Sequence, residues 1–276
     1  MTNLNRLPGP PAPPHAPPRH PSVLREAVRR NIGDAPDPDM VLMPALTPQA
    51  EVALLARALH REGYDDHIAG HIAYEQPDGT FFVNPFELPW DEVRTSDVMR
   101  IDRDGDVLEG TRWSASRALR MHLVLHRIRR DVVVSVHNHP RYGTIWADLK
   151  RIPPVYDQTS ALIDQDIAVY DEWGGLVGEW DAAEKVAAAM GDRPAALLAH
   201  HGVFVAGRSI REAYIRCMAL EWRCRNAWMV EAIERPEPMP RGNREALATR
   251  IDTIGYRALW EAMVRREIRH DPSVLD

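Results

Sequence analysis

A run of valines interrupted by one serine, residues 132–136, is followed directly by two histidines that a single residue separates. Such an apolar run is typical of a buried central strand, and alternate residues of a strand project to the same face. His137 and His139 can therefore converge on one ion, although two polar residues can also simply close a strand. Imidazoles beside a core strand cost free energy unless they have partners, which favours a metal site.

The residue type of this pair restricts the ions that it can bind. Imidazole suits zinc, iron, copper or nickel better than magnesium or calcium, and it lies about 2.0–2.1 Å from a bound zinc ion. A third ligand has to come from another segment, and His201, directly before Gly202, is the natural candidate. The adjacent His200 would point the opposite way on a strand, so we do not expect it to be a ligand.

Helical and strand patterns surround the histidine pair. Thr47 can cap a helix with Pro48 in its first turn, and apolar residues recur at helical spacing until Gly63. Short apolar segments separated by turn residues indicate strands. The expected strands cover 71–75, 80–83, 98–102, 107–109, 132–136, 197–198 and 203–205, and further helices cover 116–130, 181–191, about 210–234 and about 242–267.

Composition limits the class of protein only broadly. The 276 residues carry a net charge of -6 and are 45% apolar, which suits one large soluble domain or two small ones. An acidic chain without a dense basic cluster gives no reason to expect nucleic acid. No stretch approaches the roughly 20 apolar residues of a membrane span, and the N-terminus lacks the apolar core of a secretory signal, so a cytoplasmic location is expected.

The N-terminal segment differs from the rest. Residues 1–21 contain eight prolines, which prevent helix and sheet ladders, so an extended tail is expected, with a docking ligand as the alternative. We expect this tail and a connection over 1–46, and the domain over 47–270. Cys217 and Cys224 share a predicted helix and lie about 10 Å apart along its axis, which is too far for a disulfide.

Four segments resemble the class II aldolase/adducin family in order and spacing. They read GHIAYEQPDGTFFVNPF, TSDVMRIDRDGDVLEG, VVSVHNHPRYGTIWA and ALLAHHGVFVAGRSIREAY, within about residues 50 to 232. The resemblance implies a three-layer α/β/α domain around a mostly antiparallel sheet, in a cyclic homotetramer with active sites between subunits. It also implies that His137, His139 and His201 bind one divalent transition metal per subunit, Fe(II) or Zn(II).

The chain departs from the sugar-phosphate aldolases of this family at two places. Those enzymes carry a catalytic Glu four residues before a helix histidine; aligned through His122, that position is Ala118, which cannot transfer a proton. Their phosphate pocket also differs, since this chain has a histidine at 71 and the sequence NPFE at 84–87. A phenyl ring and a carboxylate are poor company for a phosphate dianion, so no sugar phosphate is expected.

Five other residues are candidates for the chemistry of the site. His71 and Tyr142 are the candidate catalytic residues in place of the missing Glu, because each carries a group that can move a proton. Asn84, Phe86 and Arg141 are the candidates for substrate binding. Arg141 directly follows the histidine motif and can reach a bound carboxylate, and Phe86 suits an aryl substrate better than a sugar.

A three-histidine metal with open positions can polarise a carbonyl or bind a 2-oxo or 2-hydroxy acid through two oxygens. We therefore expect an enzyme that cleaves a C–C bond in a small aryl acid, by decarboxylation or, with iron, by oxygenation. Such family members include hydroxybenzoate-type decarboxylases and the iron oxygenases of aminocoumarin antibiotic pathways, which form a substituted mandelate and then a benzoate. Two alternatives stay open: an aldolase acting on a non-phosphorylated hydroxy-ketone, and a non-enzymatic interaction protein like the adducin heads.

Overall fold

The computed structural model describes residues 43–163, 167–172, 178–248 and 254–276. The expected tail, 1–46, lies outside this part except for its last four residues, so the predicted domain boundaries stay predictions. Helix α1, Pro48–Arg61, begins as predicted, because the Thr47 side chain accepts a hydrogen bond from the Ala50 amide and Pro48 occupies the first turn. No helix within the described ranges is long and apolar enough to cross a membrane.

The described strands form one eight-stranded sheet. They are β1 His71–Glu75, β2 Phe81–Val83, β3 Met99–Ile101, β4 Val107–Glu109, β5 Val134–Asn138, β6 Ala168–Tyr170, β7 Ala195–Leu198 and β8 Gly202–Gly207. Their order across the sheet is β4-β3-β2-β1-β5-β8-β7-β6. Only the β6–β7 pair is parallel among these strands, so the predicted mostly antiparallel sheet is confirmed.

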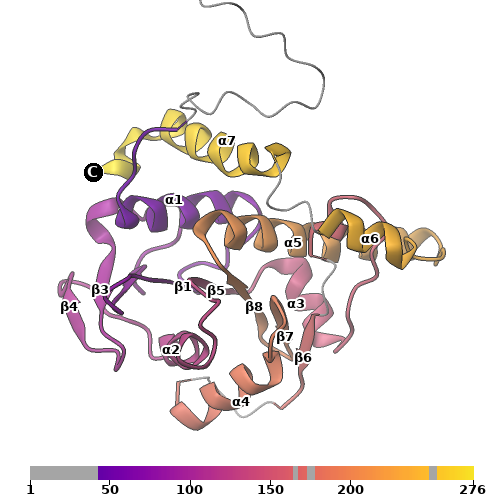
Figure 1. The fold of residues 1–276 in the computed structure, drawn as a ribbon, viewed down its shortest axis with the longest axis horizontal. Coiled ribbons are helices and arrows are strands. Elements are labelled where there is room, and N and C mark those ends of the chain that lie inside the picture. The colour runs from indigo at the N-terminus through magenta and orange to yellow at the C-terminus, as the bar shows by residue number, and fades with distance from the viewer. Residues whose placement is uncertain (1–42, 164–166, 173–177, 249–253) are drawn as a thin grey trace, which may run out of the picture. The chain divides into compact units, whose positions relative to one another are not determined.

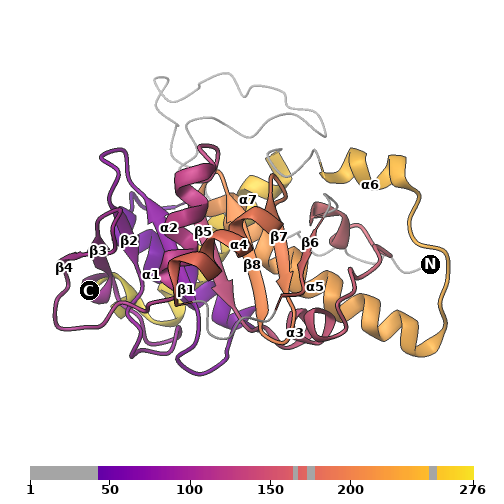
Figure 2. The ribbon, with the colours of Figure 1, turned by 90° about the horizontal axis from the view of Figure 1, so that it is seen from below.

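Helices cover both faces of this sheet. The remaining helices are α2 Leu119–Ile128, α3 Arg141–Asp148, α4 Trp180–Met190, α5 Ile210–Ile233, α6 Arg241–Ala248 and α7 Ile254–His270. Figure 1 and Figure 2 show α1, α5 and α7 on one side of the sheet and α2 and α4 on the other. The predicted three-layer α/β/α architecture is therefore confirmed.

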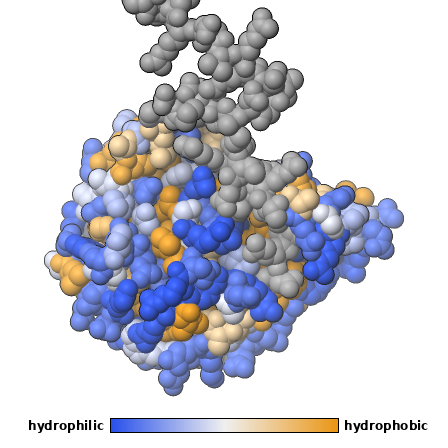
Figure 3. All heavy atoms as spheres, viewed as in Figure 1, coloured by the Kyte–Doolittle hydropathy of each residue, from blue (hydrophilic) through white to orange (hydrophobic). Residues whose placement is uncertain are grey.

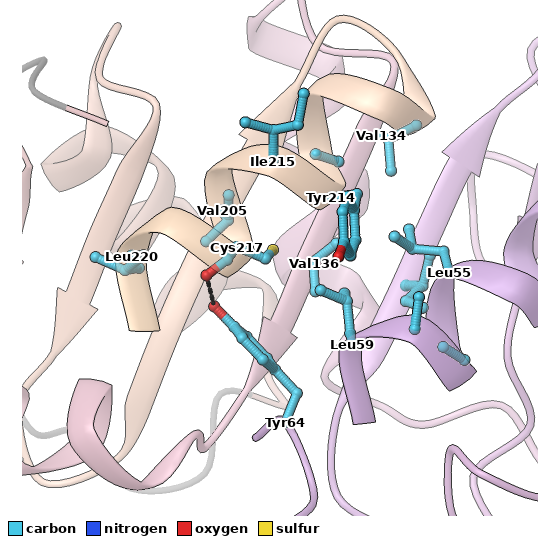
Figure 4. Close-up of a cluster of buried hydrophobic side chains, with 14 of the residues drawn as sticks. Leu55, Leu59, Tyr64, Val134, Val136, Val205, Tyr214, Ile215, Cys217 and Leu220 are labelled. Atoms are coloured by element: carbon cyan, nitrogen blue, oxygen red, sulfur yellow. Dashed lines mark hydrogen bonds between the residues drawn. The ribbon is translucent and has the colours of Figure 1, made fainter. Parts of the chain in front are cut away.

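Side chains of β5 alternate between the two faces of the sheet, so this strand contacts both layers of helices. Val134 and Val136 pack with side chains of α1 and α5 in the largest apolar cluster (Figure 4). Ser135 and His137, one residue out of phase, face the α2 side, where Ser135 contacts a helix histidine. The valines thus anchor the strand in the core while the alternate positions remain available for polar chemistry.

The two cysteines have the predicted state. Cys217 and Cys224 are fully buried free thiols on α5. The Tyr64 hydroxyl donates a hydrogen bond of 2.8 Å to the Cys217 carbonyl, which ties the segment after α1 to α5 (Figure 4).

On the face shown in Figure 3, hydrophilic residues predominate and hydrophobic ones are scattered among them.

Several elements differ from the sequence prediction. Helix α3 and strand β6 were not expected, and α6 and α7 replace the single helix expected near 242–267. Residues 249–253, between those two helices, lie outside the described ranges. Strand β5 runs two residues beyond the expected end, because its ladder with β8 continues to the pair Asn138–Val203. His137 therefore lies inside the ladder rather than after it.

Candidate active site

Three histidines from two segments of the chain meet where the central strands β5 and β8 lie side by side. His137 lies inside β5, His139 directly follows that strand, and His201 ends the turn that leads into β8. One ring nitrogen of each residue lies within 4.8 Å of the others. Two nitrogens on one zinc ion are at most roughly 4.2 Å apart, so small side-chain rotations are enough to close the set. The structure therefore brings the three predicted ligands together as a possible metal site.

Hydrogen bonds orient two of these rings. Nδ1 of His137 lies 2.8 Å from the Val203 carbonyl oxygen, and Nδ1 of His139 lies 2.7 Å from the Asp66 carboxylate. Both partners only accept hydrogen bonds, so in each neutral ring Nδ1 carries the proton and Nε2 keeps a lone pair. Nε2 of His139 is buried and has no hydrogen-bond partner. An orphaned nitrogen in a ring held by a carboxylate fits a divalent transition metal.

Burial keeps the rings of His137 and His201 uncharged. Together with a smaller effect of the nearby His139, it lowers the pKa of His201 to about 4. Burial also lowers the pKa of His137 well below its ordinary value. Because a metal binds the neutral imidazole, neither ring has to lose a proton to bind an ion near neutral pH.

Gly202 and Gly70 allow neighbouring atoms to pack closely around the C-terminal end of β5. A Cβ on Gly202 would lie 2.5 Å from the Asn138 carbonyl oxygen and 2.6 Å from Cδ2 of His139. A Cβ on Gly70, whose φ is 106°, would overlap the Asn138 side chain. The ring of His139 is therefore held by the shape of its surroundings as well as by Asp66.

The three histidines line an open pocket with about 870 Å³ of empty space, counting its mouth. Ala118, which the resemblance aligns with the catalytic Glu of sugar-phosphate aldolases, also lines it and contributes a methyl group. Phe86 contributes an aromatic side chain that is 40% exposed. The pocket wall beside the possible metal site is thus largely apolar.

His71 lines the same pocket and is buried. Its ring stacks on that of His137, with centroids 5.4 Å apart, and its Nδ1 has no hydrogen-bond partner. Burial, with smaller effects of His139 and His201, lowers the pKa of His71 to about 3. The ring is therefore neutral near pH 7, where it can donate or accept a hydrogen bond but cannot pair with an anion as a cation.

Three predicted site residues do not line the pocket within the described part of the chain: Asn84, Arg141 and Tyr142. The buried Asn84 side chain accepts a hydrogen bond from the Ile72 amide, so it holds two strands together. Arg141 and Tyr142 begin α3, and the ring of Tyr142 packs against Trp228, with centroids 5.8 Å apart. Their positions do not support the predicted roles in catalysis and substrate binding.

The charges around the pocket also differ from the expected ones. Glu87 does not line it; its carboxylate accepts a hydrogen bond of 3.0 Å from the Ser114 amide instead. Arg117, which was not among the predicted residues, does line it. The expected argument against a phosphate therefore keeps only the phenyl ring of Phe86, and Arg117 brings a cation to the pocket lining.

A chain of buried polar groups lies between α2 and the sheet. His122 and His126 share the hydroxyl of Ser135, at 2.7 and 2.9 Å, and the other ring nitrogen of His126, Nδ1, lies 3.0 Å from the Glu75 carboxylate. Because a carboxylate only accepts hydrogen bonds, Nδ1 of a neutral His126 ring donates to Glu75, and its Nε2 accepts from the Ser135 hydroxyl. The Ser135 oxygen in turn accepts a hydrogen bond from Nδ1 of His122. Nε2 of His122 then stays without a hydrogen-bond partner beside the ring of His71.

Glu221 of α5 joins α3 to the histidine motif. Its carboxylate accepts hydrogen bonds from the amides of Tyr142 and Gly143, at 2.9 and 2.8 Å, and so satisfies the start of α3. Since α3 begins two residues after His139, this contact fixes the backbone that carries a possible ligand. Sequence reasoning missed both Glu221 and Asp66, because each meets the motif only through the fold.

Replacing Glu221 with Gln should change how stability depends on pH. Burial raises the pKa of Glu221 from 4.5 to about 7, against the lowering effect of the two amides. A carboxyl group whose pKa is raised on folding stabilises the fold below its unfolded pKa, and this contribution is lost as pH rises through about 7. From pH 5 to pH 8 we expect the free energy of unfolding of Glu221→Gln to rise relative to wild type by up to about 3 kcal/mol. Urea unfolding at both pH values measures this, and a constant difference would contradict it.

The topology describes an α/β domain, and its convergent histidines form a possible metal site. Residues 50–228 match the family described as Class II Aldolase and Adducin N-terminal domain, which is more than half of the chain. The chain therefore belongs to the class II aldolase and adducin family, and its relatives include enzymes.

Two curated relatives and one solved structure show which proteins this chain is similar to. The chain is 29% identical to the decarboxylase NovR of Streptomyces niveus over 224 residues, which cover 78% of this chain and 83% of that protein. It is 29% identical to a 4-hydroxy-3-prenylphenylpyruvate oxygenase/4-hydroxy-3-prenylbenzoate synthase of Streptomyces roseochromogenus subsp. oscitans, over 68% of this chain and 69% of that protein. Among solved structures, L-fuculose 1-phosphate aldolase from Glaciozyma antarctica PI12 shares the fold, with a TM-score of 0.73 and 20% identity over 85% and 98% of the two chains.

Proposed function

We propose that this chain is a metal-dependent enzyme that cleaves a C–C bond in a small aryl oxo- or hydroxy-acid, by decarboxylation or by iron- and oxygen-dependent decarboxylation. One observation carries the proposal: three convergent histidines share a pocket with Ala118, the position that the resemblance aligns with the catalytic Glu of sugar-phosphate aldolases. The ordinary aldol route then lacks its general acid/base at the usual place. Loss of CO₂ from an acid does not require that group.

The relatives support a particular version of this reaction. One is a decarboxylase, and the other is an oxygenase that also forms a prenylated benzoate. The aromatic side chain of Phe86 in the pocket suits an aryl group. We therefore propose formation of a substituted mandelate or benzoate, within antibiotic biosynthesis, as the specific reaction.

The proposal assigns roles to five residues of the site. His137, His139 and His201 would hold one Fe(II) or Zn(II) per subunit, with Asp66 orienting the ring of His139. A bound ion of this kind supplies Lewis-acid chemistry and open positions for substrate oxygens. His71 presents a neutral ring that can hold or release a proton at one nitrogen inside the pocket.

An aldolase acting on a non-phosphorylated hydroxy-ketone is the second candidate. The orphaned Nδ1 of His71 favours it, because this nitrogen lies in a residue that lines the pocket and can accept a proton. A non-enzymatic, adducin-like role has less support, because the three ligand positions are intact and converge.

We also propose a homotetramer with active sites at subunit interfaces. The outer half of α5 supports an interface, because large apolar side chains are 47–90% exposed there: Trp222, Trp228, Met229 and Ile233. A molar mass of one chain, 31.3 kDa, by light scattering would contradict this assembly. The cytoplasmic location stays a prediction.

The function is tested by metal analysis together with measured gas exchange. The purified protein should contain iron or zinc. With aryl 2-oxo acids such as phenylpyruvate, the iron form should take up one O₂ for each CO₂ released and form the mandelate. CO₂ release without O₂ uptake indicates a decarboxylase. A folded protein that binds no metal, or that binds one and only joins an aldehyde to a ketone, would contradict the proposal.

A further inference from the structure

A guanidinium group at the pocket wall lacks a partner. Arg117 directly precedes Ala118 at the start of α2; its side chain is exposed and lines the pocket with the three histidines. Within the described ranges its guanidinium forms neither a hydrogen bond nor an ion pair. An arginine in such a position is available to a ligand.

The neighbouring Arg120 accounts for the lack of an ion pair at Arg117. Arg120, one turn farther along α2, donates a hydrogen bond to the Gly178 carbonyl and lies 3.5 Å from the Glu179 carboxylate. Its guanidinium also covers the ring of Trp180, at 5.3 Å from the centroid. Glu179 is the only acidic residue among the described residues of the pocket, so Arg120 already engages the pocket's own anion.

Arg117 is the only arginine or lysine among the described residues that line the pocket. A guanidinium presents paired donors that match both oxygens of a carboxylate. The geometry points to Arg117 as the residue that binds a carboxylate of the substrate. This inference rests on the proposed function and defines its substrate as an acid held at two places, the histidine cluster and Arg117.

Sequence adjacency predicted Arg141 for this role, because it follows the histidine motif. In the structure Arg141 begins α3 and lies outside the pocket lining. The two arginines therefore form a matched pair, since both are exposed and only Arg117 lines the pocket.

Binding of a charged probe and of its neutral analogue to the metal-loaded, full-length protein tests the inference. 3-Phenylpropionate has a carboxylate but no 2-oxo group to react, and 3-phenylpropan-1-ol lacks the charge. By calorimetry, Arg117→Gln should bind 3-phenylpropionate about ten- to a hundredfold more weakly and the alcohol unchanged. Arg117→Lys should fall between, because Lys keeps the charge without the planar fork. Arg141→Gln should bind both probes as wild type does.

Two results would overturn the inference. The first is equal affinity of wild type and Arg117→Gln for 3-phenylpropionate. The second is Arg117-dependent binding of phenyl phosphate at least about tenfold tighter than that of 3-phenylpropionate, which would make this a phosphate site.

Metal content and CO₂ release from phenylpyruvate, measured on the same preparations, separate this inference from the proposed function. Arg117-dependent binding without CO₂ release contradicts the function alone. CO₂ release with an unchanged KM in Arg117→Gln contradicts the inference alone.

Discussion

Replacing His137 with alanine is expected to weaken binding of zinc or iron by more than about a hundredfold. Loss of a hydrogen-bond partner behind a ligand histidine typically costs ten- to a hundredfold in metal affinity, so loss of the ligand itself should cost more. With two histidines left, the turnover of aryl 2-oxo acids should disappear as well. Metal content after gel filtration, and competition with a chromogenic chelator, measure the change, and circular dichroism verifies that the variant is folded.

The chain offers a matched control in His200. It adjoins His201 but lies in the turn between β7 and β8, with φ at 59° and its ring directed to Asp148 at 3.8 Å. His200→Ala should keep the full metal content and activity. Asp66→Asn should fall between the two variants, because it weakens the hydrogen bond that orients His139 without removing a ligand. A folded His137→Ala protein that retains one ion per chain would refute the ligand assignment.

The sequence was sufficient for those parts of the fold in which local pattern and packing agree. Strands β1 and β4 begin and end at the predicted residues, because turn residues bound them on both sides. Helix α3 was missed, because Gly143 and Thr144 are weak helix formers and its first amides are satisfied by Glu221, 78 residues farther along the chain. Strand β6 has three residues and one parallel neighbour, too little for a local signal.

The sequence was likewise sufficient to predict only part of the candidate site. The three histidines could be predicted, because strand alternation and the Gly after His201 are local features. The residues around them could not, because loops and helices bring them together over long separations: Asp66 meets His139 across 73 residues. Arg141 does not line the pocket although it closely follows His139 in the chain, because the backbone turns into α3 at this residue. Arg117 lines the pocket because α2 begins there, and no local feature of the sequence indicates this position.

Replacing Gly202 with alanine should damage both the fold and the metal site. The added Cβ would lie 2.5 Å from the Asn138 carbonyl oxygen and 2.6 Å from Cδ2 of His139, and backbone cannot give way as a flexible side chain can. Overpacking of this kind typically costs about 1–3 kcal/mol. The relief available is a rotation of the His139 ring, which would move Nε2 away from its place beside His137 and His201. We therefore expect a lower free energy of unfolding and at least about tenfold weaker metal binding.

The other end of β8 separates these two effects. A Cβ on Gly207 would lie 2.6 Å from the Ala213 amide nitrogen, so Gly207→Ala should destabilise the fold by a similar amount. It lies far along the strand from His139, so the metal affinity of the folded fraction should stay at the wild-type value. Gly242→Ala should change neither property for the worse, because nothing lies within 4 Å of its Cβ position. If Gly202→Ala and Gly207→Ala lost stability equally and both kept full metal affinity, the glycine after His201 would serve the packing of β8 alone, and the close fit around His139 would have no part in metal binding.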